Sequence, residues 1–386
     1  MVETPSRGPL AGRRVLELAG IGPGPFACML LADLGAEVIR IDRPTGSGIA
    51  PPASKADVLN RGKRSIVLDL KRQEAVEAVL TLAETADVLV EGNRPGVTER
   101  LGVGPEDVWT RNPKLVYGRM TGWGQQGPLA HTAGHDIGYI AVTGALGAIG
   151  SAGGPPQIPL NLVGDFGGGS LYLVTGVLAA LLEAERTGHG QVVDAAIVDG
   201  ASHLMGVIHS LLGSGRWVDQ RGENLLDGGA PYYSVYETAD GGYMAVGAIE
   251  PKFYAELLRL LGLPAEQVDP AAQNDRGTWP QLRALLADTF RGRTRAEWTA
   301  VFEGSDACVA PVVGLREAAA HTHVAARGSV LEVDEVLQPG QAPRFSAHPG
   351  WSPALPPAPG RDTREVLSAA GLDVSELLKA GIAVEP

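Results

Sequence analysis

Short apolar strands alternate with helical segments through the first third of the chain, and this alternation limits the fold more than any other feature. Hydrophobic periodicity predicts a first strand–turn–helix–strand unit over residues 13–18, 19–25, 25–35 and 37–42. The alternation continues with strands at 65–70, 87–92 and 114–120 and a helix at 73–85. Because helices that connect successive strands are typical of parallel sheets, we predict an α/β fold with a doubly wound open sheet.

Basic residues gather where the predicted strands end. Asp42-Arg43, Asp69–Arg72 and Gly92–Arg94 each follow a strand, and open α/β sheets bind ligands beyond those carboxyl ends. Residues 1–130 hold 16 Lys and Arg against 15 Asp and Glu, whereas the rest holds 16 against 29. A small polyanion is therefore a possible ligand, although most of these cations are expected simply to be solvated. The basic candidates are Arg40, Arg43, Arg61, Lys63, Arg64, Lys71, Arg72, Arg94 and Arg100.

Several classes of protein do not fit the composition. The net charge of −12 and the lack of a basic run argue against a nucleic-acid partner. Two cysteines, Cys28 and Cys308, are too few for a disulfide scaffold, fit a reducing compartment, and are expected to be packed thiols. The first residues lack the apolar core of a signal peptide, and the apolar run 171–182 is shorter than the ~20 residues of a membrane span. We expect a cytoplasmic protein with no membrane partner. We also expect no metal, because no cysteine or acidic cluster with metal-ligand spacing accompanies His321 and His323.

The pattern of predicted helices and strands changes near residue 220, and this change predicts a second domain. A helix at 170–186, a strand at 191–195 and a helix from 196 precede the change. After it we expect a hairpin of strands 232–237 and 243–249, helices at 251–262, 279–290 and 294–303, and a strand at 308–313. The expected boundaries are a large domain at 1–205, a linker at 206–224 and a small α+β domain at 225–325. Residues 338–360 are too rich in proline and glycine for regular structure, and helices at 363–370 and 374–380 close the chain.

The turn GIGPGP at 20–25 is a weak candidate for a dinucleotide site. It lacks the third glycine of the G-x-G-x-x-G pattern, and two prolines interrupt it. Asp42 stands where a ribose-binding acid would follow the second strand, but Arg43 comes directly after it. A rigid turn beside a different nucleotide-like ligand is the better interpretation.

Two ionisable residues lie in unusual backbone contexts. His135 is in TAGHDIGY, between Gly134 and a second acid, and Asp165 is in NLVGDFGGGS, before three glycines and an apolar helix. An imidazole and a carboxylate are the smallest set that can move protons at carbon without a metal. The glycines could leave amides open at a helix N-terminus, where negative charge is favoured, or could allow close helix packing. Asp165 could equally be an N-cap, and His135 could equally be structural.

Long ordered motifs make the chain similar to a known family. They are RVLELAGIGPGPFA, GAEVIRIDRP, VLVEGNRPGVTERLG, RMTGWGQQGP, AGHDIGY, NLVGDFGGGS and GQVVDAAIVDG. Together they resemble the α-methylacyl-CoA racemases of the class III CoA-transferase superfamily. The resemblance implies a large Rossmann-like domain, a small domain, and two linkers that make each protomer a ring. Two rings interlock in an obligate homodimer, and residues 326–386 form the second linker and return to the large domain.

The resemblance also implies the site. His135 and Asp165 match the catalytic bases, and Glu250 matches the acid that the small domain of the partner subunit presents to the histidine. Asn93 stands where relatives often carry tyrosine. The positions that match CoA-binding residues are Arg43, Leu68, Asp69, Leu70, Lys71, Gly92, Asn93, Arg94, Arg100, Gly134, Asp136, Ile137, Gly138 and Tyr139.

The implied reaction inverts C2 of a 2-methyl-branched acyl-CoA through an enolate, with no cofactor. His135 and Asp165 would act on opposite faces, and burial beside Phe166 would raise the pKa of the Asp165 carboxyl. Amides near 165–169 would meet the enolate oxygen. Two other functions stay open: CoA transfer with Asp165 as nucleophile, and non-catalytic binding of acyl-CoA.

Overall fold

The computed structural model describes residues 8–45 and 55–386. The chain divides into two compact units: the first contains residues up to 143, 160–204 and 319–386, and the second contains 144–159 and 205–318. Residues 206–224, expected as a linker, group with the second unit together with 144–159. The reason is a set of local bonds, since the Arg221 guanidinium donates to the carbonyl oxygens of Gly147 and Gly154.

The first unit is built on a seven-stranded sheet in the order β12-β3-β2-β1-β4-β5-β6. All neighbouring strands are parallel except β12, which pairs antiparallel with β3. The α/β prediction is therefore confirmed. The strands are β1 (Arg14–Leu18), β2 (Glu37–Asp42), β3 (Arg64–Leu68), β4 (Val88–Glu91), β5 (Val116–Thr121), β6 (Val192–Ala196) and β12 (Ala383–Val384).

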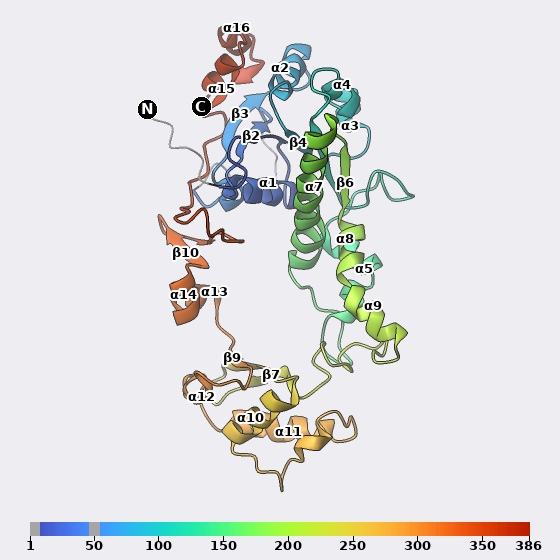
Figure 1. Cartoon of the computed structure of the whole chain (residues 1–386), viewed down its shortest axis with the longest axis vertical. Helices are drawn as coiled ribbons and strands as arrows, with labels where there is room; N and C mark the ends of the chain where they lie inside the picture. The colour runs from blue at the N-terminus through green and yellow to red at the C-terminus, as the bar shows by residue number, and fades with distance from the viewer. Residues whose placement is uncertain (1–7, 46–54) are drawn as a thin grey trace. The chain divides into compact units, whose positions relative to one another are not determined.

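Helices cover both faces of this sheet (Figure 1). Along β1 the side chains alternate: Val15 packs with α1 and α7 on one face, while Leu16 packs with α2 and α15 on the other. Both faces are apolar because both are buried, as is usual for parallel sheets. The helices of this unit are α1 (Pro23–Asp33), η1 (Val58–Asn60), α2 (Gln73–Ala83), α3 (Val97–Leu101), α4 (Pro105–Trp109), α5 (Asp136–Val142), η2 (Leu162–Ser170), α7 (Leu171–Thr187), α8 (Ile197–Leu204), α14 (Thr322–Arg327), α15 (Thr363–Ala369) and α16 (Val374–Lys379).

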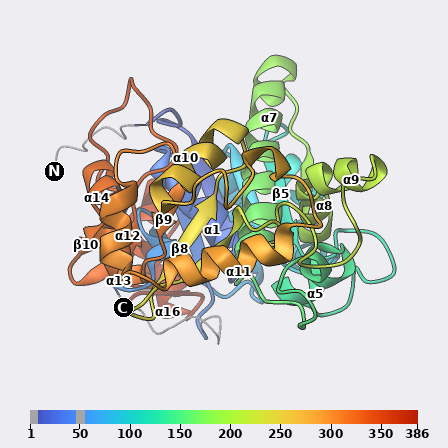
Figure 2. The same cartoon turned by 90° about the horizontal axis from the view of Figure 1, so that it is seen from below.

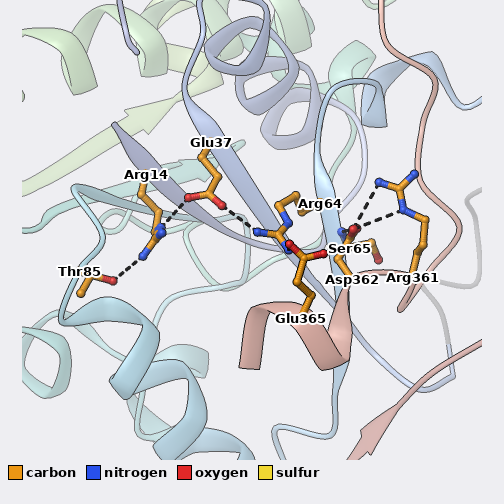
Figure 3. Close-up of polar contacts among 8 residues, drawn as sticks. All are labelled: Arg14, Glu37, Arg64, Ser65, Thr85, Arg361, Asp362 and Glu365. Carbon is orange, nitrogen blue, oxygen red and sulfur yellow. Dashed lines mark hydrogen bonds and ion pairs between the residues drawn. The ribbon is translucent and has the colours of Figure 1, made fainter. Parts of the chain in front are cut away.

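Polar contacts fix the C-terminal segment to the amino ends of the first strands (Figure 3). The Asp362 carboxylate accepts the Ser65 amide at 2.8 Å, and the Arg64 guanidinium forms an ion pair with Glu365 at 3.0 Å. The Glu37 carboxylate accepts hydrogen bonds from both the Arg64 and the Arg14 guanidinium groups. The Asp373 carboxylate accepts the Glu376 amide at 3.2 Å and caps the start of α16. These contacts bring the last residues of the chain to the edge of the sheet, where β12 extends it.

Part of the segment expected to be irregular is a strand. Val330–Val333 (β10) and Val336–Pro339 (β11) form an antiparallel hairpin. Its turn residues Asp334 and Glu335 both have positive φ, with values of 50° and 68°. The expected irregular region at 338–360 therefore begins only after Pro339. No glycine marks this turn, which is why the pattern of residues did not reveal it.

The second unit has a three-stranded antiparallel sheet in the order β7-β8-β9. The predicted hairpin is present, and its turn uses Gly241 at φ 74°. Helices α10, α11 and α12 lie against this sheet (Figure 2). In the core that they share with it, Tyr236 and Phe290 stack with ring centroids 5.2 Å apart. The elements are α6 (Ala145–Ala148), α9 (Gly206–Gly213), β7 (Tyr233–Glu237), β8 (Tyr243–Gly247), α10 (Pro251–Leu261), η3 (Pro270–Ala272), α11 (Trp279–Phe290), α12 (Arg295–Phe302) and β9 (Val309–Pro311); α13 (Leu315–Ala320) spans the boundary between the units.

Two details differ from the sequence prediction. Cys28 is buried as expected, but Cys308 is exposed, at a backbone position with φ 54°. The helical stretch Leu162–Thr187 is longer than the predicted helix because η2 runs directly into α7. By length and apolar composition this stretch alone among the described residues meets the requirements for crossing a membrane. In the structure its Leu173, Val174 and Val177 side chains pack on the sheet.

Candidate active site

A cavity of about 480 Å³ lies at the carboxyl ends of β1, β2, β4 and β5. In this sheet β1 stands between β2 and β4, so the strand order reverses there. Such a switch point is where open α/β sheets place their ligands. Residues from the turn after β1, from the loop after β4 and from the start of α5 line the cavity, and both His135 and Asp165 are among them.

Asp165 lies inside η2, which is a π-helix, and is not an N-cap. Its carboxylate accepts the Asn161 side-chain amide at 3.2 Å, and its backbone amide donates to the Asp136 carboxylate at 2.7 Å. Burial raises the pKa of the Asp165 carboxyl, and the charge of Asp136 raises this pKa further, while Asn161 and His135 oppose the shift. The half-buried carboxyl can therefore hold a proton at a higher pH than an ordinary aspartate.

The three glycines after Asp165 serve close packing. A Cβ on Gly200 of α8 would come within 1.8 Å of the Gly168 carbonyl oxygen, so the two backbones touch. We expected the backbone amides of residues 165–169 to have no hydrogen-bond acceptor. This expectation is wrong for the first two of them. The Asp165 amide donates to Asp136, and the Phe166 amide donates to the Asn161 carbonyl. Phe166 instead stacks on Phe26, with ring centroids 4.4 Å apart.

His135 occupies the N-cap position of α5 and is exposed. Its carbonyl oxygen accepts the Gly138 amide at 2.8 Å, which begins the helix. Tyr139, one turn later, is buried against Trp123 and lines the same cavity. Gly134 leaves room for that ring, because a Cβ there would come within 2.6 Å of it. Burial, and then the Asp165 charge, raise the pKa of the Tyr139 phenol.

The residues expected to bind CoA fall into two groups. Arg43, Gly92, Asn93, Arg94, Gly134 and Tyr139 line the cavity together with the two bases. Leu68 is fully buried in the core, Leu70 packs against the core, and Asp69 donates its amide to the Ile382 carbonyl beside β12. The other expected positions outside the cavity are Lys71, Arg100, Asp136, Ile137 and Gly138, and their contacts with CoA stay predictions.

Ion pairs separate the free basic residues from the structural ones. Lys63 is buried against Glu17 at 2.6 Å, and Arg61 is buried against Asp33 at 2.6 Å. Arg40, Arg64 and Arg72 also pair with carboxylates. Among the described residues no carboxylate pairs with the four remaining candidates, which are Arg43, Lys71, Arg94 and Arg100. Asp42, the candidate ribose acid, is buried and bonded to Arg40 and Ser65, so it is not free for a ligand.

Glu91 is a site residue that the sequence analysis missed. It ends β4, lines the cavity, and is buried. Its carboxylate accepts the Asn93 amide at 2.6 Å, which shapes the loop that carries Arg94. Burial raises the pKa of the Glu91 carboxyl to about 7. The signal available in the sequence was an acid placed directly after the apolar run VLV at a strand end.

Glu250 belongs to the second unit. It is exposed, occupies the N-cap position of α10, and accepts the Tyr254 amide through its carbonyl oxygen at 2.9 Å. Its predicted contact with His135 of the partner subunit stays a prediction.

Comparisons with known proteins show the family of this chain. The model of CoA-transferase family III matches residues 10–363. The chain belongs to CoA-transferase family III. Other matches within this CoA-transferase family include the alpha-methylacyl-CoA racemase of Mus musculus, 45% identical over 96% of this chain and 95% of that protein. The alpha-methylacyl-CoA racemase of Homo sapiens is 43% identical over 95% of each chain. The succinyl-CoA:glutarate CoA-transferase of Mus musculus is 31% identical over 93% of this chain and 86% of that protein.

Two solved structures are similar to this chain over almost its whole length. The crystal structure of a CAIB/BAIF family protein from Brucella suis superposes with a TM-score of 0.80, at 27% identity, over 94% of this chain and all of that one. The crystal structure of Rv3272 from M. tuberculosis gives a TM-score of 0.76, at 31% identity, over 92% of this chain and 98% of that one.

Proposed function

We propose that this chain is a racemase that inverts C2 of 2-methyl-branched acyl-CoA thioesters without a cofactor. The observation that carries the proposal is that His135 and Asp165, two bases of different kind, line one cavity. The relatives named alpha-methylacyl-CoA racemase, at 43% and 45% identity over nearly the whole chain, support the same reaction. The substrate's natural acyl group is left open.

Inversion requires proton removal on one face of C2 and proton delivery on the other. One base takes the proton, and the C–H electron pair moves into the thioester enolate. The second base then donates its proton to the opposite face, and the pair returns to C2. Imidazole is the side chain that enzymes use most often as a general base, and His135 supplies one here. The raised pKa of the Asp165 carboxyl helps it to hold the proton that it must deliver.

Backbone amides are suited to stabilise the enolate oxygen. Within the described part of the chain, the His135 side chain makes no hydrogen bond to the first-turn amides of α5. In that turn the Gly138 amide already donates to the His135 carbonyl oxygen at 2.8 Å. The first two amides of the 165–169 segment are also bonded, so neither is free for the enolate oxygen.

Arg43 and Arg94 would hold the phosphates of CoA. Both are exposed, line the cavity, and lack a carboxylate partner among the described residues, so their guanidinium groups are free for an anion. Arginine is well suited to phosphate because its planar group donates two parallel hydrogen bonds.

The direct test is α-proton exchange. One enantiomer of a 2-methylacyl-CoA is incubated with the protein in D₂O, and deuterium at C2 is followed with the stereochemistry. A racemase gives deuterium incorporation together with inversion. A non-catalytic acyl-CoA-binding protein leaves the α-hydrogen in place, which would end the proposal.

CoA transfer is the competing reaction, and the transferase relative at 31% identity makes it worth a separate test. In that reaction Asp165 attacks the thioester carbonyl and CoA leaves, which forms an acyl anhydride. Hydroxylamine or borohydride added during turnover would then modify Asp165. A racemase leaves Asp165 unmodified under the same conditions.

The proposal includes a cytoplasmic homodimer in which Glu250 of the partner subunit contacts His135. Co-expression of His135→Ala and Glu250→Ala chains tests this assembly. A hybrid dimer of that kind has one site with both wild-type residues, so activity returns only if the two residues act across subunits. Activity that stays absent from a purified hybrid dimer would show that each chain supplies its own Glu250.

A further inference from the structure

Asp136 follows His135 directly, but its side chain points into the protein. It is 8% exposed, and it is not among the residues that line the cavity. One carboxylate oxygen accepts the Asp165 backbone amide at 2.7 Å. The other has no hydrogen-bond partner within the described residues. The side chain therefore contacts the segment that carries the second base, not a ligand.

The contact between Asp136 and η2 leaves no space for a side chain. A Cβ on Gly164 would come within 2.2 Å of the bonded Asp136 oxygen and 3.0 Å of Ile140. The residue before Asp165 must therefore be glycine for the bond to form. Each of the two bases is next in sequence to one of the two residues in this contact.

We infer that Asp136 is a positioning residue that ties the segment carrying Asp165 to the helix carrying His135 and so sets the separation of the two bases. This inference rests on the proposed racemase function, because only a reaction with two bases needs their separation to be fixed. It also assigns Asp136 a role other than the CoA contact expected from the sequence.

The negative charge of Asp136 has a second effect. The hydrogen bond needs only an acceptor oxygen, which an asparagine would also supply. Asp136 nevertheless forms no ion pair among the described residues, and leaving a buried carboxylate unpaired is costly. That charge faces Asp165 and raises the pKa of its carboxyl. The other groups that face Asp165 are His135 and Tyr139 of α5 and Asn161 of η2.

Two substitutions separate the bond from the charge. Asp136→Asn keeps the acceptor and removes the charge, so we expect kcat within about threefold of wild type. The acid limb of the kcat/KM profile should move to lower pH, because the charge that raises the pKa of Asp165 is gone. Asp136→Ala removes both, and kcat should fall about 10- to 100-fold with KM unchanged, as for a displaced catalytic group. Asp107→Asn is the matched control, since Asp107 accepts the Gly104 amide at 3.0 Å outside the cavity.

The outcomes distinguish this inference from the proposed function. If wild-type protein shows no α-deuterium exchange, the racemase proposal fails and the inference fails with it. If wild-type protein racemises but Asp136→Asn leaves the acid limb in place, or Asp136→Ala raises KM at constant kcat, the inference alone is wrong.

A third variant covers the case in which Asp136→Ala does not fold. Gly164→Ala keeps every charge but pushes Asp136 away from Asp165, so it should lower kcat without changing KM. Wild-type kcat in Gly164→Ala would overturn the inference. The kcat/KM pH profile of the wild-type protein is a further check. An acid limb at the ordinary aspartate value of ~3.9 would contradict a raised pKa of the Asp165 carboxyl.

Discussion

The Arg43 guanidinium donates to the Asn93 side-chain oxygen at 3.3 Å. This bond joins the residue after β2 to the loop after β4, across the end of β1, at the switch point of the sheet. Both residues line the cavity, so Asn93 directs a free cation toward the space where a polyanion would lie. Asn93 therefore orients Arg43 in this protein.

Replacing Arg43 or Arg94 by alanine should raise KM about tenfold and leave kcat nearly unchanged. The reason is that phosphate contacts hold the substrate equally in the ground state and the transition state. Steady-state kinetics with an acyl-CoA at two salt concentrations checks this, and the wild-type KM should rise with salt. Arg111→Ala is the control, because Arg111 pairs with Glu77 and Glu84 outside the cavity. A loss confined to kcat would contradict the phosphate assignment.

His135→Ala should lose most α-deuterium exchange from one enantiomer and retain some from the other. In the proposed reaction each base faces one side of C2, so removing His135 leaves Asp165 able to exchange the proton on its own side. Loss of a general base typically costs about 10²- to 10⁴-fold. Asp165→Asn should show the reverse preference. Equal residual exchange from both enantiomers in either variant would argue against two distinct bases.

Glu91 should make stability depend on pH between about 4.5 and 7. The pKa of its carboxyl is about 7 in the folded protein against a reference value of 4.5. The folded state thus binds more protons in this window, and its free energy of unfolding falls as pH rises. The expected loss is about 3 kcal/mol. Urea unfolding of wild type and Glu91→Gln at pH 5 and pH 8 measures it, since glutamine keeps an acceptor for the Asn93 amide.

Glu99 is the control for the sign of this effect. Burial alone would raise the pKa of its carboxyl, but the hydrogen bond and charge of Arg119, together with bonds from its own backbone and from Thr98, lower this pKa overall. Glu99→Gln should therefore destabilise the protein at neutral pH, and the difference should disappear as the pH falls. The raised pKa of Glu91 would be wrong if Glu91→Gln, like Glu99→Gln, destabilised the protein at neutral pH and this difference disappeared as the pH fell.

The buried ion pair beneath the cavity should show a strong asymmetry between single and double substitutions. Lys63 donates to Glu17, to the Pro25 carbonyl and to the Asn60 side chain. Lys63→Met leaves Glu17 buried without a cation and should cost about 3–5 kcal/mol in free energy of unfolding. The double variant Lys63→Met with Glu17→Leu should recover most of that loss. Urea denaturation of the three proteins tests this, and additive losses would show that the pair does not act as a unit.

Local sequence patterns were enough to predict most strands and helices. Val15 and Leu16 are apolar because both faces of β1 are covered, and this produces the continuous apolar runs that mark a parallel sheet. His135 and Asp165 also stood out from their neighbours alone. In contrast, the glycines after Asp165 fitted two interpretations: unbonded amides at a helix N-terminus, or close packing of helices. The contact between Gly168 and Gly200 shows that they serve close packing.

The basic residues show most clearly what the sequence determined and what the tertiary structure decided. The sequence offered nine candidate cations, several of them at predicted strand ends, but nothing local separated Arg43 from Lys63. Their roles depend on carboxylates brought close by folding: Lys63 meets Glu17, 46 residues earlier. Asp136 is a similar case, since its partner Asp165 is 29 residues away. Periodicity and turn chemistry act over a few residues and can be read along the chain, whereas charge pairing and burial depend on contacts between distant segments and exist only once the sheet has assembled.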